Sequence, residues 1–146
     1  MKRTRRILDI YDSILVRLAH LYIGSLAVNA AVPETYKENP FYYVSGFLAG
    51  AIGRTLDHIS TIPGIKLINT KKFKEKKMSS QFYETNIFVG KNPTMKKYIL
   101  SAIPQDLILL GITTCHPNLG YSYLSEAFIT HINNKRKTKD LEEELK

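Results

Sequence analysis

Four polar residues with side chains suited to chemistry follow a long uncharged run, and their spacing puts them on one face of a helix: Arg54, Asp57, His58 and Thr61. Unpaired polar groups are costly in a buried or membrane-embedded segment, so such a cluster needs a role. Arg54 and Asp57 can neutralise each other, and a histidine beside them can relay a proton or bind a metal. The alternative for His58 is a hydrogen-bonded interfacial histidine with a purely structural role.

A second carboxylate, Glu84, lies downstream between a basic stretch and a short apolar patch. Together with Asp57 it would suit a divalent cation, or the pair would divide into a general acid and a general base. The alternative is that Glu84 caps or flanks a short helix and faces solvent. The sequence therefore predicts a candidate polar site made of Arg54, Asp57, His58, Thr61, Glu84 and Asn86. It identifies no reaction and no cofactor, and it leaves open whether the protein is an enzyme.

The order of these residues resembles that in an uncharacterised family of small prokaryotic multi-helix membrane proteins. The family pattern is an Asp, then Ser/Thr-Thr three residues on, then Glu-x-Asn-Pro. The matching residues here are Asp57, Ser60, Thr61, Glu84 and Asn86, and the resemblance covers residues 40 to 134. Ile87 stands where the family usually has Pro, and the linker here is long and basic. The resemblance implies a membrane location and marks these residues as functional, but it transfers no activity.

The chain has 146 residues and a formal net charge of +8, and its length suits one domain. Basic residues gather near the start, near the end and in a central linker that contains Lys66, Lys71, Lys72, Lys74, Lys76 and Lys77. Such blocks suit anionic lipid headgroups or nucleic acid equally well on charge alone. A lone cysteine, Cys115, excludes an internal disulfide framework. The four histidines are too dispersed for a zinc motif, so no metal site of that kind is predicted.

Apolar periodicity predicts an all-α fold of about four helices, over residues 7–32, 40–62, 95–112 and 119–133, with the basic linker between the second and third. Pro33 and Pro63 are expected to end the first two helices, and Pro104 to kink or break the third near its start. We expect a single helical domain over residues 1–134. A charged tail over residues 135–146 is expected to form a short solvated helix or a disordered end.

Two features point in opposite directions on whether the chain crosses a membrane. No segment is a clean span, because charged residues interrupt them, which favours a soluble bundle. If the segments do cross in succession, however, all three basic blocks fall on one side. The opposite connections, 34–39 and 115–118, are slightly acidic or free of Lys and Arg. The small residues of the second segment would permit close helix contact in lipid: Gly46, Ala49, Gly50 and Gly53. The sequence therefore favours a small polytopic membrane bundle.

Within such a bundle, the remaining polar residues need partners. Asp106 and Glu126 are expected to meet each other, or to pair with Arg17 or Arg54. Several tyrosines lie near segment ends, as interfacial aromatic residues do: Tyr22, Tyr36, Tyr42, Tyr43, Tyr98, Tyr121 and Tyr123.

Two functional hypotheses follow. The leading one is a small multi-pass membrane protein with both termini in the cytoplasm and its polar constellation near the cytoplasmic face. That constellation would serve as a cation or proton site, or the protein would be a structural subunit of a larger membrane complex. Its partners would be anionic headgroups of the bilayer and other membrane subunits. The alternative is a soluble, cytoplasmic, basic helical protein that binds nucleic acid through Lys66–Lys77.

Overall fold

The structure is a computed structural model that describes residues 14–70, 73 and 94–146. Within these residues the chain is all helical, which confirms the expected fold class. The helices are α2 (Ile14–Ala31), α3 (Glu34–Lys37), α4 (Pro40–Ile68), α6 (Met95–Cys115) and α7 (Pro117–Leu145). The described residues thus form five helices rather than four. The additional one, α3, is a four-residue turn in the connection between α2 and α4.

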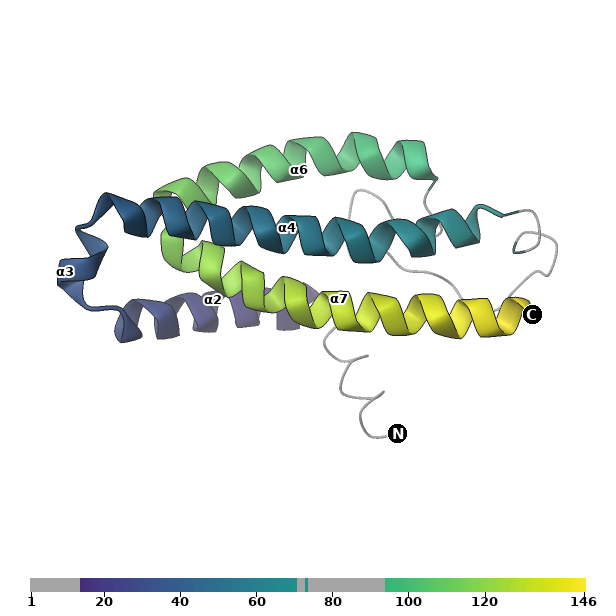
Figure 1. Cartoon of the computed structure of the whole chain (residues 1–146), viewed down its shortest axis with the longest axis horizontal. Coiled ribbons are helices and arrows are strands. Elements are labelled where there is room, and N and C mark those ends of the chain that lie inside the picture. Colours follow the sequence, from purple (N-terminus) through teal and green to yellow (C-terminus); the bar gives the residue numbers. More distant parts are fainter. Residues whose placement is uncertain (1–13, 71–72, 74–93) are drawn as a thin grey trace.

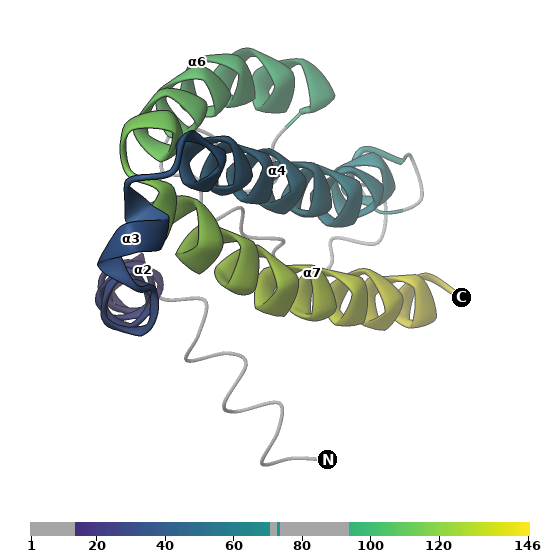
Figure 2. The same ribbon diagram turned by 60° about the vertical axis from the view of Figure 1, so that its left-hand side comes forward.

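The long helices α4 and α7 form the central pair, with the most extensive contact in the molecule. The other two long helices flank this pair, since α2 packs mainly on α7 and α6 packs mainly on α4. Figure 2 shows α4 lying between α6 and α7, with α2 beside α7. In Figure 1, α3 and the α6–α7 connection lie at one end of the bundle. The end of α4, the start of α6 and the C-terminus lie at the other.

Local capping signals fix where two of the helices begin. The Asn39 side chain accepts a hydrogen bond of 2.9 Å from the Phe41 backbone N–H, and Pro40 occupies the first turn of α4. The Thr94 side chain likewise accepts from the Lys97 backbone N–H at 3.2 Å and starts α6. Both starts agree with the sequence prediction, because caps and prolines are local signals.

Three helices continue past a residue where the prediction ends, kinks or breaks them. Helix α4 continues through Pro63 to Ile68, and α6 is continuous through Pro104. Helix α7 continues past residue 133 to Leu145, so residues 135–145 of the expected tail are part of α7. The extensions of α4 and α7 pack on each other. Their contact forms an apolar cluster, which offsets the cost of about 3 kcal/mol for a proline inside a helix. The cluster contains Ile65, Ile68, Phe73, Tyr98, Leu141 and Leu145.

The stripe of small residues lies at the helix crossings. Gly46, Gly50 and Gly53 are all buried. A Cβ atom on Gly50 would lie 2.8 Å from the Thr113 hydroxyl oxygen of α6, and one on Gly53 would lie 3.0 Å from the Tyr123 ring of α7. A Cβ atom on Gly120 of α7 would overlap the Gly46 carbonyl. Glycine therefore allows α4 to approach both neighbours closely.

Candidate functional site

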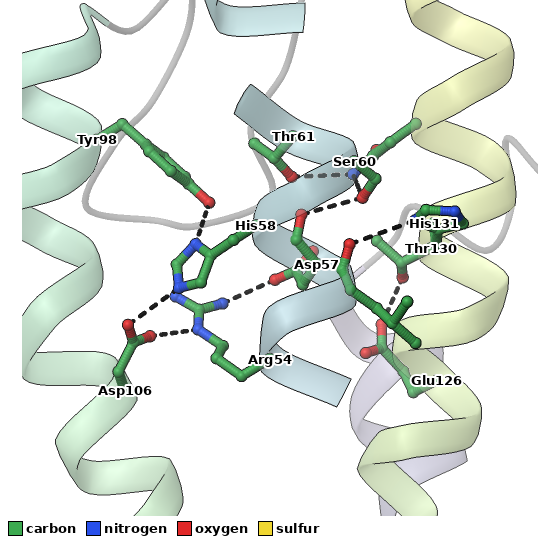
Figure 3. Close-up of polar contacts among 12 residues, drawn as sticks. Arg54, Asp57, His58, Ser60, Thr61, Tyr98, Asp106, Glu126, Thr130 and His131 are labelled. Carbon is green, nitrogen blue, oxygen red and sulfur yellow. Dashed lines mark hydrogen bonds and ion pairs between the residues drawn. The ribbon is translucent and has the colours of Figure 1, made fainter. Parts of the chain in front are cut away.

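Two clusters of polar side chains lie between the helices. The α4–α6 cluster comprises Arg54, Asp57, His58, Tyr98 and Asp106. The α2–α7 cluster comprises Arg17, His20, Ser125, Glu126 and Thr130. Figure 3 shows the first cluster across the gap between α4 and α6, and Glu126 with Thr130 on α7.

Arg54 is the centre of the α4–α6 cluster. Its Nη1 donates to Asp57 Oδ2 at 2.7 Å, one turn along α4, and its Nε donates to Asp106 Oδ1 on α6. The guanidinium therefore lies between two carboxylates from different helices (Figure 3). Tyr123 of α7 lies close enough to interact electrostatically with Arg54. A buried guanidinium is stabilised by such partners, and it occupies the position that a bound cation would need between the two carboxylates.

His58 extends the cluster on its α6 side. Its Nε2 lies 3.0 Å from Asp106 Oδ2, and its Nδ1 lies 2.7 Å from the Tyr98 hydroxyl. The Tyr98 ring packs edge-on against the imidazole, with 5.7 Å between ring centroids. Both ring nitrogens of His58 therefore have partners, and Asp106 uses one oxygen for Arg54 and the other for His58.

The α2–α7 cluster is built around an ion pair that a hydroxyl bridges. Arg17 Nε lies 3.1 Å from Glu126 Oε1, and Arg17 Nη2 donates to the Thr130 hydroxyl at 2.7 Å. The same hydroxyl donates to Glu126 Oε1 at 2.9 Å. Beside this triad, His20 Nε2 lies 2.8 Å from the Ser125 hydroxyl. The expectation that Asp106 and Glu126 meet each other or pair with arginines is thus resolved, because Asp106 pairs with Arg54 and Glu126 with Arg17.

Only some of the predicted site residues come together. Arg54, Asp57 and His58 lie in the α4–α6 cluster, but Thr61 does not. Thr61 is buried against α7, where its hydroxyl accepts from Asn134 Nδ2 at 3.0 Å. Seven residues separate Thr61 from Arg54, which places it two turns further along α4, at the level of Asn134 on α7.

Several predicted residues lie outside the described part of the chain: Lys71, Lys72, Lys74, Lys76, Lys77, Glu84 and Asn86. The pairing of Asp57 with Glu84 therefore stays a prediction. Lys66 is described, and it is exposed near the end of α4.

Sequence reasoning missed Tyr98. Its place near the start of a segment suggested an interfacial aromatic residue, whereas it is buried and its hydroxyl contacts His58. Tyr98 and Asp106 are eight residues apart, so they lie about two turns apart on α6. Their roles depend on a neighbouring helix, and no local pattern signals that dependence.

A cavity of about 410 Å³ lies at the α3 end of the bundle, away from both clusters. Its lining includes Tyr22, Asn29, Lys37, Cys115 and His116. The described residues that line it include no Asp or Glu. Within the described chain, Cys115 and His116 therefore lack an orienting acid in this cavity, and we assign them no catalytic role.

The described residues hold no group of three or more His, Cys, Asp or Glu side chains placed to bind a metal ion. Comparison with known protein families, with curated proteins and with solved structures found no match. The resemblance based on Asp57, Ser60 and Thr61 stays a prediction. The site is therefore interpreted from its own chemistry.

Proposed function

We propose that this chain is a small integral membrane protein that crosses the bilayer with α2, α4, α6 and α7. The observation that carries the proposal is an inverted distribution of side chains: the charged groups of the bundle point inward and the large apolar groups point outward. In water, so much exposed apolar surface would favour aggregation. In a bilayer it is the expected outer surface.

The charged side chains support this reading. Within the helical stretches 14–31, 40–62 and 98–134, five side chains carry formal charges: Arg17, Arg54, Asp57, Asp106 and Glu126. Every one of them belongs to an interhelical or intrahelical ion pair. Such complete pairing is what a low-dielectric surrounding requires, because an unpaired charge there is very costly.

The large apolar side chains point outward, which also supports this reading. On α6, Leu107 is 69% exposed and Ile108 is 63% exposed, and on α2, Ile23 is 64% exposed. Helix α6 is the one described helix that is long and apolar enough to span a membrane, and only 17% of its apolar window is buried. A core helix of a soluble protein would be mostly buried. Its 21 residues extend about 31 Å, close to the thickness of the hydrocarbon layer.

The two ends of the bundle differ in charge, which supports an orientation. Exposed lysines lie at the end where α4 finishes and α6 starts: Lys66, Lys96 and Lys97. At the opposite end, residues 32–39 and 115–118 carry one lysine against two glutamates. By the positive-inside rule the lysine-rich end faces the cytoplasm, where it would contact anionic headgroups.

Within this membrane protein we propose that the α4–α6 cluster is the functional site and the α2–α7 cluster a structural one. The His58 and Asp106 side chains are 25% and 27% exposed, whereas Arg17 and Glu126 are 19% and 6% exposed. A site that exchanges a ligand needs such access, and a structural ion pair does not. We therefore propose that this cluster is an ion site, for a cation or a proton, the two ligand classes that its residue types permit.

The native cysteine provides the test. Cys115 is the single cysteine of the chain and is exposed at the α6–α7 connection. In intact cells a membrane-impermeant maleimide should label it from outside. A Cys115→Ser variant with Lys139→Cys should react only after permeabilisation. The protein should also stay in membranes after carbonate washing.

Labelling of both positions from the same side would contradict the four-span topology. Recovery of the full chain in the soluble fraction without detergent would contradict the membrane location. In that case a salt-sensitive gel shift with nucleic acid would test the alternative of a basic soluble protein.

A further inference from the structure

We propose that the α4–α6 cluster binds one proton at His58, with Asp106 as its counter-ion and Tyr98 as a hydrogen-bond partner that reverses direction. This inference names the ligand of the proposed site, and it rests on the proposed function for the low-dielectric surrounding of that site. It selects the proton from the two classes of ligand, cation or proton, that the residue types permit.

The α4–α6 cluster lacks one positive charge when His58 is neutral. Arg54 is a single guanidinium that faces two carboxylates, Asp57 on its own helix and Asp106 on α6. Among the described residues, the hydrogen-bond partners of His58 add no further cation, since α6 contributes the neutral hydroxyl of Tyr98 beside Asp106. On the α7 side of Arg54 lie Tyr123 and the Glu126 carboxylate, and the latter is already paired with Arg17. With His58 neutral, the five residues of the cluster therefore carry one net negative charge.

A proton on His58 neutralises that charge without rearranging the helices. In the neutral imidazole, Nε2–H donates to Asp106 Oδ2 and Nδ1 accepts from the Tyr98 hydroxyl. When a proton from water adds to Nδ1, the new N–H donates to the Tyr98 oxygen and the tyrosine hydroxyl hydrogen turns away. No heavy atom has to move, because the 2.7 Å contact between Nδ1 and the Tyr98 hydroxyl suits either direction, and Nε2–H donates to Asp106 at 3.0 Å in both charge states.

A metal cation fits the same residues poorly. Both Asp106 oxygens already have partners, and Arg54 lies between the two carboxylates. The described chain also offers no set of three or more ligating side chains around an ion position. A proton needs a single lone pair, which Nδ1 supplies.

A second histidine gives a useful contrast. His131 Nδ1 lies 3.3 Å from the backbone carbonyl oxygen of Leu56. A carbonyl accepts but cannot donate, so this contact favours an N–H on Nδ1 in both charge states and has no reversible partner. The Leu56 contact of His131 is therefore not reversible, whereas the hydroxyl contacts of His58 with Tyr98 and of His20 with Ser125 are.

The test uses the full chain in lipid nanodiscs with ¹⁵N-labelled histidine and follows the imidazole signals by NMR. A His58→Gln variant assigns one of the four signals. The pH is varied from about 8 to 5, the range in which histidines ordinarily change charge, and the proposal requires the His58 signal to gain a doubly protonated form. In Asp106→Asn the protonated fraction at a given pH should fall about tenfold, because the counter-ion is lost. At each pH, the signal of the exposed His116 should be the same in Asp106→Asn as in the wild type.

Controls keep the result specific. Glu142→Gln makes the same carboxylate-to-amide change at an exposed position of α7 and should leave the His58 signal as in the wild type. If Asp106→Asn does not fold, Asp57→Asn replaces it. That variant removes the more distant carboxylate and should lower the protonated fraction about threefold.

Three results would overturn the inference: a His58 signal that keeps one charge state over this pH range, a conversion unchanged in both aspartate variants, or a response to Na⁺ or Mg²⁺ at constant pH. Failure of the membrane proposal is detected separately by the cysteine labelling. Titration of His58 against Asp106 in a detergent-free soluble protein would retain the proton site and refute the membrane location.

Discussion

Along the α4–α7 pair, two regions place opposite kinds of side chain between the helices. In the inverted region, residues 46–58 and 117–131, the interior holds glycines, ion pairs and hydroxyls, and residues such as Phe47, Ile52 and Phe128 are exposed. In the conventional region, residues 62–68 and 135–145, the interior holds Ile65, Leu141 and their neighbours. The same two helices therefore follow two packing rules.

The difference indicates a change of surroundings along one helix pair. Burial of Ile65 and Leu141 is favourable only where water is the alternative, because the hydrophobic effect depends on water. In the inverted region, close glycine contacts and interhelical polar bonds hold the helices together, as expected in lipid. Between the two regions lies a layer of hydroxyl and amide groups, where Asn134 bonds Ser60 at 3.2 Å and Thr61 at 3.0 Å. If the membrane proposal holds, the cytoplasmic surface of the bilayer lies near this layer.

The largest expected effect comes from breaking the ion pair that Glu126 of the inverted region forms with Arg17 of α2. Glu126→Leu leaves the Arg17 guanidinium without its carboxylate and should lower the free energy of unfolding by about 4 kcal/mol. The double variant Arg17→Met with Glu126→Leu should recover all but about 1 kcal/mol, since no lone charge remains. Reversible unfolding in mixed micelles measures both. A double variant as unstable as the single one would show that the pair is not acting as a unit.

A charge placed on the exposed face of α6, which packs beside the inverted region, tests the surroundings of that region directly. Leu107→Arg should cost about 3 kcal/mol of insertion free energy in a membrane and reduce the yield of membrane-inserted protein. The control Glu142→Arg puts the same side chain on the conventional region and should change stability by less than about 0.5 kcal/mol. Equal, negligible effects of the two arginines would mean that water surrounds both regions.

The sequence predicts most of the inverted region because its signals are local. Apolar periodicity locates the helices, and Pro40 and the Asn92-Pro93 pair indicate two helix starts. A lone carboxylate in an apolar segment also signals a partner, which is why the arginine partners of Asp106 and Glu126 were among those expected.

The conventional region was predicted less well, because it depends on contacts between distant residues. Pro63 and the charged residues after Lys135 are helix-ending signals when taken alone. They are overridden because Ile65 and Ile68 meet Leu141 and Leu145 across the two helices. The contact of Tyr98 with His58 is nonlocal in the same way and has no signature in the sequence near either residue.

A truncation in the apolar cluster should affect the conventional region alone. Leu141→Ala removes buried methyl groups and should cost about 2 kcal/mol, at the lower end for such changes because the helix end can relax. Trypsin should then cleave faster in the segment 135–139, while maleimide labelling of Cys115 stays unchanged. Leu107→Ala, the same change on the exposed face of α6, should leave the cleavage rate as in the wild type. Loss of the whole fold in Leu141→Ala would instead show that the two regions unfold as one.

The smallest expected effect concerns a hydroxyl that joins two helices. The Thr130 hydroxyl accepts from Arg17 and donates to Glu126, so Thr130→Val should cost about 1 kcal/mol through lost hydrogen bonds at nearly constant volume. Thr114→Val is the matched control, because its exposed hydroxyl donates only to the Leu110 carbonyl of its own helix among the contacts described, at 2.7 Å. Unfolding in mixed micelles should separate the two variants. If Thr130→Val were as stable as Thr114→Val, water would have to replace the lost hydroxyl, and the interior of the inverted region would not be dry.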